Sequence, residues 1–151
     1  MKASDKVYEK SNAVETVVRK KFDTSLWKGL LDSVTDKQRQ TASQKLLNHL
    51  SDKYRIVRPD VLVCNYPRPH ATNGKRVVRE THGDYQTITH RIRIFNLTAV
   101  KHEQVSIKSF AETLLHEFMH HYDMEFLKLG ATIHTAGFYK RISDLKSCLE
   151  N

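Results

Sequence analysis

The feature that most constrains this chain is a pair of histidines four residues apart, His116 and His120, with Glu117 directly after the first. In an α-helix, residues at positions i and i+4 lie on the same face, one turn apart. Two neutral imidazoles placed in this way can bind one zinc ion, and the intervening glutamate can act as a general base. The spacing therefore predicts a helix through these residues and a metal site on one of its faces.

The residues around the motif favour a buried helix. Apolar residues recur at three- and four-residue steps and form one core-facing stripe: Leu115, Phe118, Met119, Tyr122, Phe126 and Leu129. Ser109 and Glu112 have the spacing of a capping box, which predicts that the helix begins at Ser109. Gly130 predicts where it stops. The alternative is a buried helix whose histidines are only hydrogen-bonded, and a third ligand would argue against it.

His134 is the candidate for that third ligand. A catalytic zinc site takes three protein ligands and leaves one position open. His134 follows His120 by fourteen residues, just beyond Gly130, where the chain can turn back over the helix. A second packed helix is predicted after it from the spacing of four apolar residues: Phe138, Ile142, Leu145 and Leu149. Asp144 and Glu125 are competing carboxylate ligands, although Glu125 shares a helix with His120 and should point away from the metal.

The run TLLHEFMHHYD followed by GATIHTAGFYKRISDL resembles the SprT-like zinc metalloproteases, the group that includes Spartan. The specific match extends from Thr113 to Leu145. The resemblance implies that one Zn2+ is bound by His116, His120 and His134. It also implies that Glu117 is the catalytic glutamate, which takes a proton from a zinc-activated water during hydrolysis of a peptide bond.

One residue departs from the family pattern. Glycine usually follows the third histidine directly, whereas this chain has Thr135 there and a glycine only at Gly137. Phe138 agrees with the aromatic residue that the family places four positions after that histidine. The family relationship implies proteolysis of proteins that are bound or crosslinked to DNA. Many relatives carry a separate zinc ribbon, which is not expected from the two cysteines of this sequence, so DNA contacts would come from the domain itself.

The charge of the chain favours an anionic partner. Lys and Arg number 25 against 17 Asp and Glu, which gives a net charge of +8. Nucleic acid is the first candidate for such an excess, and an inert basic surface is the alternative. The residues that we expect to contact DNA lie in a basic loop and in the strand that follows it: Arg68, Lys75, Arg76, Arg91 and Arg93.

The remaining patterns predict one α+β domain over residues 1–151, with N-terminal helices, a small antiparallel sheet, the helix of the metal site and a C-terminal helix. We expect helices over residues 5–22, 25–34 and 35–50, a buried strand over 61–64, and turns at 73–74 and 83–84. An alternating strand is expected from Thr87 to Phe95. This last strand should border the site, where its backbone could pair with an extended peptide.

The composition also bears on the compartment and on the class of protein. An apolar run of about eighteen residues, as a membrane span needs, does not occur, and no apolar segment near Met1 indicates a secretory signal. Cys64 and Cys148 lie in apolar stretches and are expected to be buried thiols in the reducing cytoplasm.

Three functions stay open at this point. The chain is a zinc endopeptidase acting near DNA, a zinc peptidase with one protein substrate and no nucleic acid, or a non-catalytic zinc-containing binding protein. Glu117 argues against the third, because a structural zinc site needs no general base and usually has four protein ligands.

Overall fold

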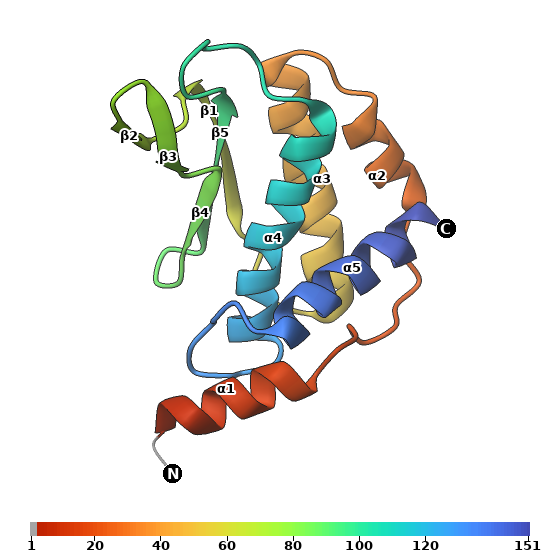
Figure 1. Ribbon diagram of the computed structural model, residues 1–151. Helices are drawn as coiled ribbons and strands as arrows, with labels where there is room; N and C mark the ends of the chain where they lie inside the picture. Colours follow the sequence, from red (N-terminus) through yellow and green to blue (C-terminus); the bar gives the residue numbers. More distant parts are fainter. Residues whose placement is uncertain (1–2) are drawn as a thin grey trace.

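A computed structural model of the chain describes residues 3–151, so Met1 and Lys2 of the predicted domain lie outside the described residues. The fold is α+β, as the sequence predicts. The helices are α1 (Ala3–Ala13), α2 (Thr24–Leu31), α3 (Asp36–Tyr54), α4 (Ile107–Glu125) and α5 (Ala136–Glu150). The strands are β1 (Asp60–Pro67), β2 (His70–Asn73), β3 (Arg76–Glu80), β4 (Gly83–Gln86) and β5 (Arg91–Leu97). Helices α3 and α4 cover the sheet, α5 crosses α4, and α1 lies beside the start of α5 (Figure 1).

The main sheet is mixed rather than antiparallel. Its order is β1-β5-β4, with β5 parallel to β1 and antiparallel to β4, while β2 and β3 form a separate hairpin. The prediction of a wholly antiparallel sheet is therefore wrong for the β1–β5 pair. The physical reason is the long connection over residues 68–90. A connection of that length can carry the chain back to the start of β1, so that β5 runs in the same direction as β1.

Helix α4 occupies the centre of the core, and its predicted apolar stripe is confirmed. Leu115, Phe118, Met119 and Tyr122 are fully buried, while Phe126 is partly buried. The Tyr122 ring packs against Phe126 and against Tyr54 of α3. One side of the helix is thus fixed in the core, which leaves its histidine-bearing side to face the sheet edge and α5.

Both ends of α4 lie earlier in the chain than predicted. The N-cap is Ser106, whose hydroxyl accepts a hydrogen bond from the backbone of Ser109 at 3.2 Å. The helix stops at Glu125, because the amides of Phe126 and Leu127 both donate to the carbonyl of Tyr122. Gly130, at φ +82°, lies in the loop that follows and does not cap the helix.

The predicted helix over residues 5–22 is wrong in its second half. Helix α1 stops at Ala13, and the chain then runs without helical structure to Asp23. Val17 donates its amide to Asp144 of α5 at 2.9 Å, and Val18 is held by the hydroxyls of Tyr122 and Tyr54. β-branched residues have low helix propensity, so contacts with the rest of the fold override the apolar periodicity here.

The region before β5 also differs from the prediction. Gly83 opens strand β4 rather than a turn, and residues 87–90 form the turn instead, with Ile88 exposed at 92%. A Cβ at Gly83 would lie 2.7 Å from the carbonyl oxygen of Arg93 and 2.9 Å from a methyl group of Thr113. The absence of a side chain at Gly83 therefore allows β4, β5 and α4 to pack closely together at this point.

The other predicted elements are confirmed with small shifts of their ends. Helix α3 is capped by Thr35 in a capping box with Gln38 and continues to Tyr54, one turn beyond the predicted end. Cys64 is buried and Cys148 partly buried, both as free thiols. No helix within residues 3–151 has the length and apolar character that crossing a membrane requires.

Candidate metal centre

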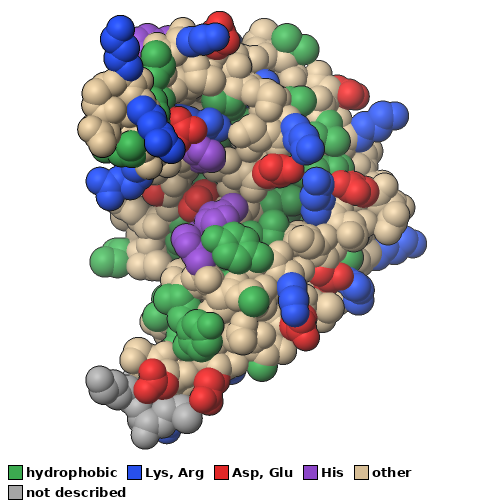
Figure 2. All heavy atoms as spheres, in the orientation of Figure 1, with side chains coloured by type: hydrophobic (Ala, Val, Ile, Leu, Met, Phe, Trp, Pro, Cys, Tyr) green, Lys and Arg blue, Asp and Glu red, His purple; other side chains and the backbone are tan. Residues whose placement is uncertain are grey.

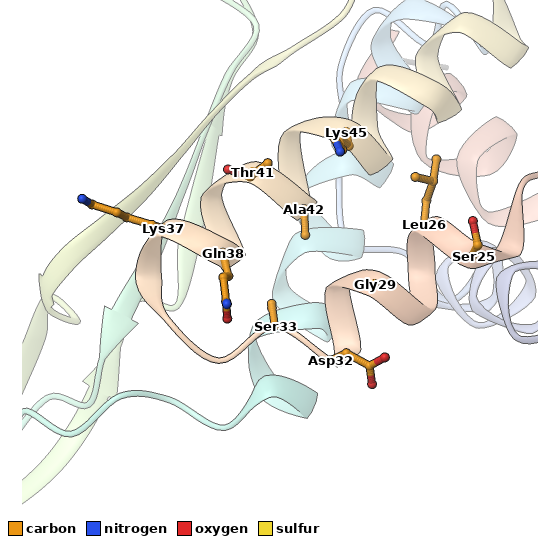
Figure 3. A pocket seen from close by; sticks show the side chains of 10 residues that line it. All are labelled: Ser25, Leu26, Gly29, Asp32, Ser33, Lys37, Gln38, Thr41, Ala42 and Lys45. Carbon is orange, nitrogen blue, oxygen red and sulfur yellow. The ribbon is translucent and has the colours of Figure 1, made fainter.

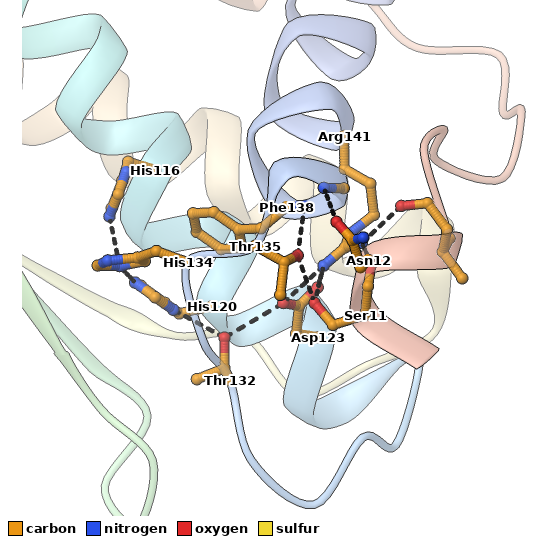
Figure 4. A network of polar contacts seen from close by, with 12 residues as sticks. Ser11, Asn12, His116, His120, Asp123, Thr132, His134, Thr135, Phe138 and Arg141 are labelled. Carbon is orange, nitrogen blue, oxygen red and sulfur yellow. Dashed lines mark hydrogen bonds and ion pairs between the residues drawn. The ribbon is translucent and has the colours of Figure 1, made fainter. Parts of the chain in front are cut away.

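Three imidazoles converge on one point beside α4. His116 and His120 project from α4, and His134 comes from the loop between α4 and α5 (Figure 4). The Nε2 atom of His134 lies 3.1 Å from Nε2 of His116 and 3.0 Å from Nε2 of His120. Nitrogen ligands of one tetrahedral zinc ion would be about 3.3 Å apart. Within the described part of the chain, this is the one group of three potential ligands close enough to share a metal ion.

The competing carboxylate ligands are engaged elsewhere. Asp144 accepts hydrogen bonds from Arg19 and from the backbone of Val17. Glu125 accepts from the ring of His90 at 2.6 Å. The donor set that the fold brings together is therefore the three histidines.

Burial keeps two of these rings neutral. Burial, with smaller contributions from the neighbouring imidazoles, lowers the pKa of His116 to about 4 and that of His120 to about 3. A neutral imidazole has a lone pair available for a metal, whereas an imidazolium has none. The chemistry of the donor set thus fits a divalent ion such as zinc.

Glu117 lies beside the three rings with its carboxyl group in the cleft. The residue is only 5% exposed, and it lines the open space in front of the histidines. Burial, with a smaller effect from Asp84, raises the pKa of Glu117 to about 8. A carboxyl group whose pKa is raised in a cleft, next to a potential metal site, is a candidate for a chemical role.

Two hollows meet at His116 and Glu117 and together form the cleft. One, of about 480 Å³, extends along the first half of α4 and includes Glu80, His82 and Glu112. The other, of about 370 Å³, extends under the loop that carries His134. Figure 2 shows histidine side chains exposed near the middle of this face of the molecule. A peptide could therefore reach the three imidazoles from solvent.

Strand β4, and not β5, borders this cleft with a free edge. The predicted pairing of a peptide with β5 is wrong, because β5 is hydrogen-bonded to β1 on one side and to β4 on the other. Among residues 3–151, strand β4 pairs with β5 alone, and Gly83, Asp84 and Tyr85 line the hollow that contains the histidines. An extended peptide would accordingly add to β4.

Two tyrosines that could assist the chemistry have different positions. Tyr122 is fully buried, and its hydroxyl accepts from the amide of Val18, so it is structural. Tyr139 is 49% exposed, with its ring 6.0 Å from that of His116 and 5.9 Å from that of His134. Of these two tyrosines, Tyr139 is therefore the one with its ring exposed beside the ligand histidines.

His121, which directly follows the ligand histidine His120, is fully buried. Its Nδ1 atom is hydrogen-bonded to the Tyr85 hydroxyl at 2.7 Å, and its Nε2 atom to the carbonyl of Val57 at 2.6 Å. It ties the cleft-lining strand to α4. Its place in the sequence, directly after a ligand histidine and on the core-facing side of the helix, would have predicted a buried, hydrogen-bonded side chain.

The predicted DNA-contacting residues do not all present their charge to solvent. Arg68 is buried and bonded to Glu80 and Ser109, and Arg93 is paired with Asp84. The remaining three are exposed: Lys75, Arg76 and Arg91.

A further hollow of about 540 Å³ lies between α2 and α3 (Figure 3). Its lining includes Leu26, Gly29 and Ala42, with Asp32, Lys37 and Lys45 at its margins (Figure 3). Neither histidine nor cysteine lines it. Of these hollows, the cleft at α4 is the one that holds the three grouped histidines.

Comparison of the chain with models of known protein families, with curated proteins and with solved structures yields no match in any of the three. The resemblance of residues 113–145 to the SprT-like family accordingly stays a prediction. What bears on function is the geometry of the cleft itself.

Proposed function

We propose that this protein is a zinc-dependent metalloendopeptidase of the SprT-like type. The observation that supports it best is the convergence of three imidazole nitrogens beside the carboxyl group of Glu117 in an open cleft. His116, His120 and His134 would hold the metal and leave a position open. Zinc bound there would act as a Lewis acid that activates water and polarises a peptide carbonyl.

The protein's own residues would handle the proton and the substrate. Glu117 would take a proton from the attacking water and transfer it to the leaving amine. A cation beside this carboxyl group favours its ionised form and so opposes the effect of burial. Tyr139 stands beside the ligands, where its hydroxyl could donate to the developing oxyanion.

A purely structural zinc site fits these residues less well. Structural sites are usually closed by four protein ligands, whereas three are available here and the cleft opens onto them. A structural site also needs no general base such as Glu117. A zinc peptidase that acts on one protein without nucleic acid shares the same chemistry and differs only in its response to DNA.

The test of the proposal is the metal content of the purified chain beside that of His134→Ala. We expect close to one zinc per wild-type chain and hydrolysis of an unfolded protein substrate, with zinc and activity both lost in the variant. Elemental analysis and gel-based cleavage measure the two. Lys140→Ala, an exposed change in the same part of the chain, is the control. A wild type that takes up no zinc on reconstitution would overturn the proposal.

We further propose that the substrates are DNA-bound proteins in the cytoplasm. The net charge of +8 supports an anionic partner, and two of the exposed basic residues, Lys75 and Arg76, lie at the tip of the β2–β3 hairpin. The hairpin projects from the sheet (Figure 1), and its last residue, Glu80, lines the cleft. It could therefore hold DNA while a protein attached to that DNA enters the site.

If DNA binds at the hairpin, Lys75→Glu with Arg76→Glu weakens binding and reduces the stimulation of cleavage by DNA. The slope of log affinity against log salt should become shallower by about 2, because each phosphate contact contributes about 0.9. Fluorescence anisotropy over a salt series measures this. Lys28→Glu with Lys45→Glu, on α2 and α3, matches the change in charge. Equal loss in both double variants would point to net charge alone, and cleavage indifferent to DNA would favour a DNA-free peptidase.

A further inference from the structure

We infer that docking of helix α1 and metal binding are coupled, so that each increases the stability of the other. A buried polar network joins the last turn of α1 to the surroundings of His120 and His134. The inference rests on the proposed metal site but not on peptidase activity. It is carried by two branches of hydrogen bonds that meet at one buried arginine, Arg141 (Figure 4).

The first branch begins at the second ligand. Nδ1 of His120 is 2.7 Å from the hydroxyl of Thr132, and that hydroxyl donates to Asp123 at 3.2 Å. With Nε2 of His120 turned to the metal site, Nδ1 carries the hydrogen and donates it to Thr132. Partners of this kind fix the tautomer and the orientation of a ligand histidine.

The second branch begins beside the third ligand. Thr135, which follows His134 directly, is the N-cap of α5, and its hydroxyl accepts from the amide of Phe138 at 3.0 Å. The same hydroxyl is hydrogen-bonded to that of Ser11 in α1 at 2.9 Å. Thr135, the residue next to His134 in the chain, is thus hydrogen-bonded to a residue of α1.

Arg141 connects the two branches. Its side chain is fully buried and donates to both carboxylate oxygens of Asp123, at 3.0 and 2.9 Å. It also donates to the carbonyls of Ser11 and Val14, each at 2.6 Å. One guanidinium group therefore binds both Asp123, which is hydrogen-bonded to Thr132 beside His120, and the backbone at the last turn of α1.

The attachment of α1 depends on this contact. Within residues 4–13, Ser11 is the one residue that is buried, so α1 has little apolar surface in the core. The amide of Gly137 donates to Asn12 at 3.2 Å, and a Cβ at Gly137 would lie 2.5 Å from the carbonyl oxygen of Ser11. An element held mainly by polar contacts docks with low stability, so a change at its contact site shifts its docking equilibrium.

Coupling between two sites is reciprocal. If docked α1 favours the geometry that binds metal, bound metal must favour docked α1 by the same factor. The fraction of molecules with α1 docked would then depend on whether metal is bound, and any partner that displaced α1 would weaken metal binding.

Gly137→Ala in the full chain tests the inference, because the added methyl group displaces α1 without altering a ligand. We expect zinc affinity, measured by competition with a chromogenic chelator, to fall by about 10-fold or more, the lower end of what loss of a supporting partner costs. Gly29→Ala is the matched control: it also lies inside a helix, and its Cβ would meet nothing within 4 Å. Its zinc affinity should equal that of the wild type.

Ser11→Ala provides a second variant, which leaves α5 unchanged should Gly137→Ala fail to fold. It removes the hydroxyl that binds Thr135 and Arg141 and should lower zinc affinity in the same direction. Hydrogen exchange supplies the converse: zinc should increase the protection of α1 amides in the wild type, and less so in Ser11→Ala.

The outcomes separate this inference from the proposed function. Wild-type zinc affinity in variants whose α1 amides exchange freely would overturn the inference alone. Coupled zinc binding without hydrolysis of any protein substrate would overturn the proposed function alone. A wild type that binds no zinc would overturn both.

Discussion

We expect Glu117→Gln to lower kcat/KM for peptide hydrolysis by about 10²–10⁴-fold, the range that a general base contributes, and to leave zinc bound. The amide has nearly the shape of the carboxyl group but cannot accept the proton of the attacking water. The three imidazoles that converge on the site are untouched by the change. Kinetics on a fluorogenic peptide, with elemental analysis and thermal melting of the same sample, measure all three consequences.

The control for this variant is Glu103→Gln, an exposed glutamate in the loop before α4 that loses the same charge. Its activity and zinc content should equal those of the wild type. Full activity in zinc-loaded Glu117→Gln would show that another group moves the proton. Loss of zinc together with activity would instead show that the carboxyl group binds the metal.

The parts of the site that sequence alone predicts are those set by local spacing. His116 and His120 share a helical face whatever the rest of the chain does, and Glu117 must then lie beside them. His134 could be predicted because the loop is short and an amphipathic helix follows it. Each of these inferences needs only the neighbouring residues.

The support of the site depends on contacts between distant parts of the chain. Ser11 and Arg141 meet only because α1 folds onto α5, and no local pattern specifies that contact. A signal did exist: Asp123 and Arg141 each occupy a core-facing position among apolar residues of its helix. Two opposite charges on buried faces predict a buried ion pair, although not the residues around it.

The same limit explains the misassigned elements. Residues 14–23 have helix-like apolar spacing, but Asp144 and two tyrosine hydroxyls bind the backbone of Val17 and Val18, and the segment is not helical. The parallel pairing of β1 with β5 depends on the path of the long connection between them, which alternation along a strand does not reveal.

The largest loss of stability is expected for Arg141→Met. Removing one partner of a buried ion pair leaves the other charge uncompensated, at a cost of about 3–5 kcal/mol. Asp123 and Arg141 are both fully buried, and the variant would also strip the carbonyls of Ser11 and Val14 of their donor. Urea unfolding of metal-free and zinc-loaded protein measures the free energy of unfolding.

Two further variants identify the source of that loss. Arg141→Met combined with Asp123→Leu removes both charges and should be less destabilised than Arg141→Met alone, because no uncompensated carboxylate remains. Arg58→Met breaks an exposed ion pair with Asp52 and should change the unfolding midpoint far less. Equal destabilisation of the single and double variants would mean that the bonds of Arg141 to α1, and not its pairing with Asp123, stabilise the fold.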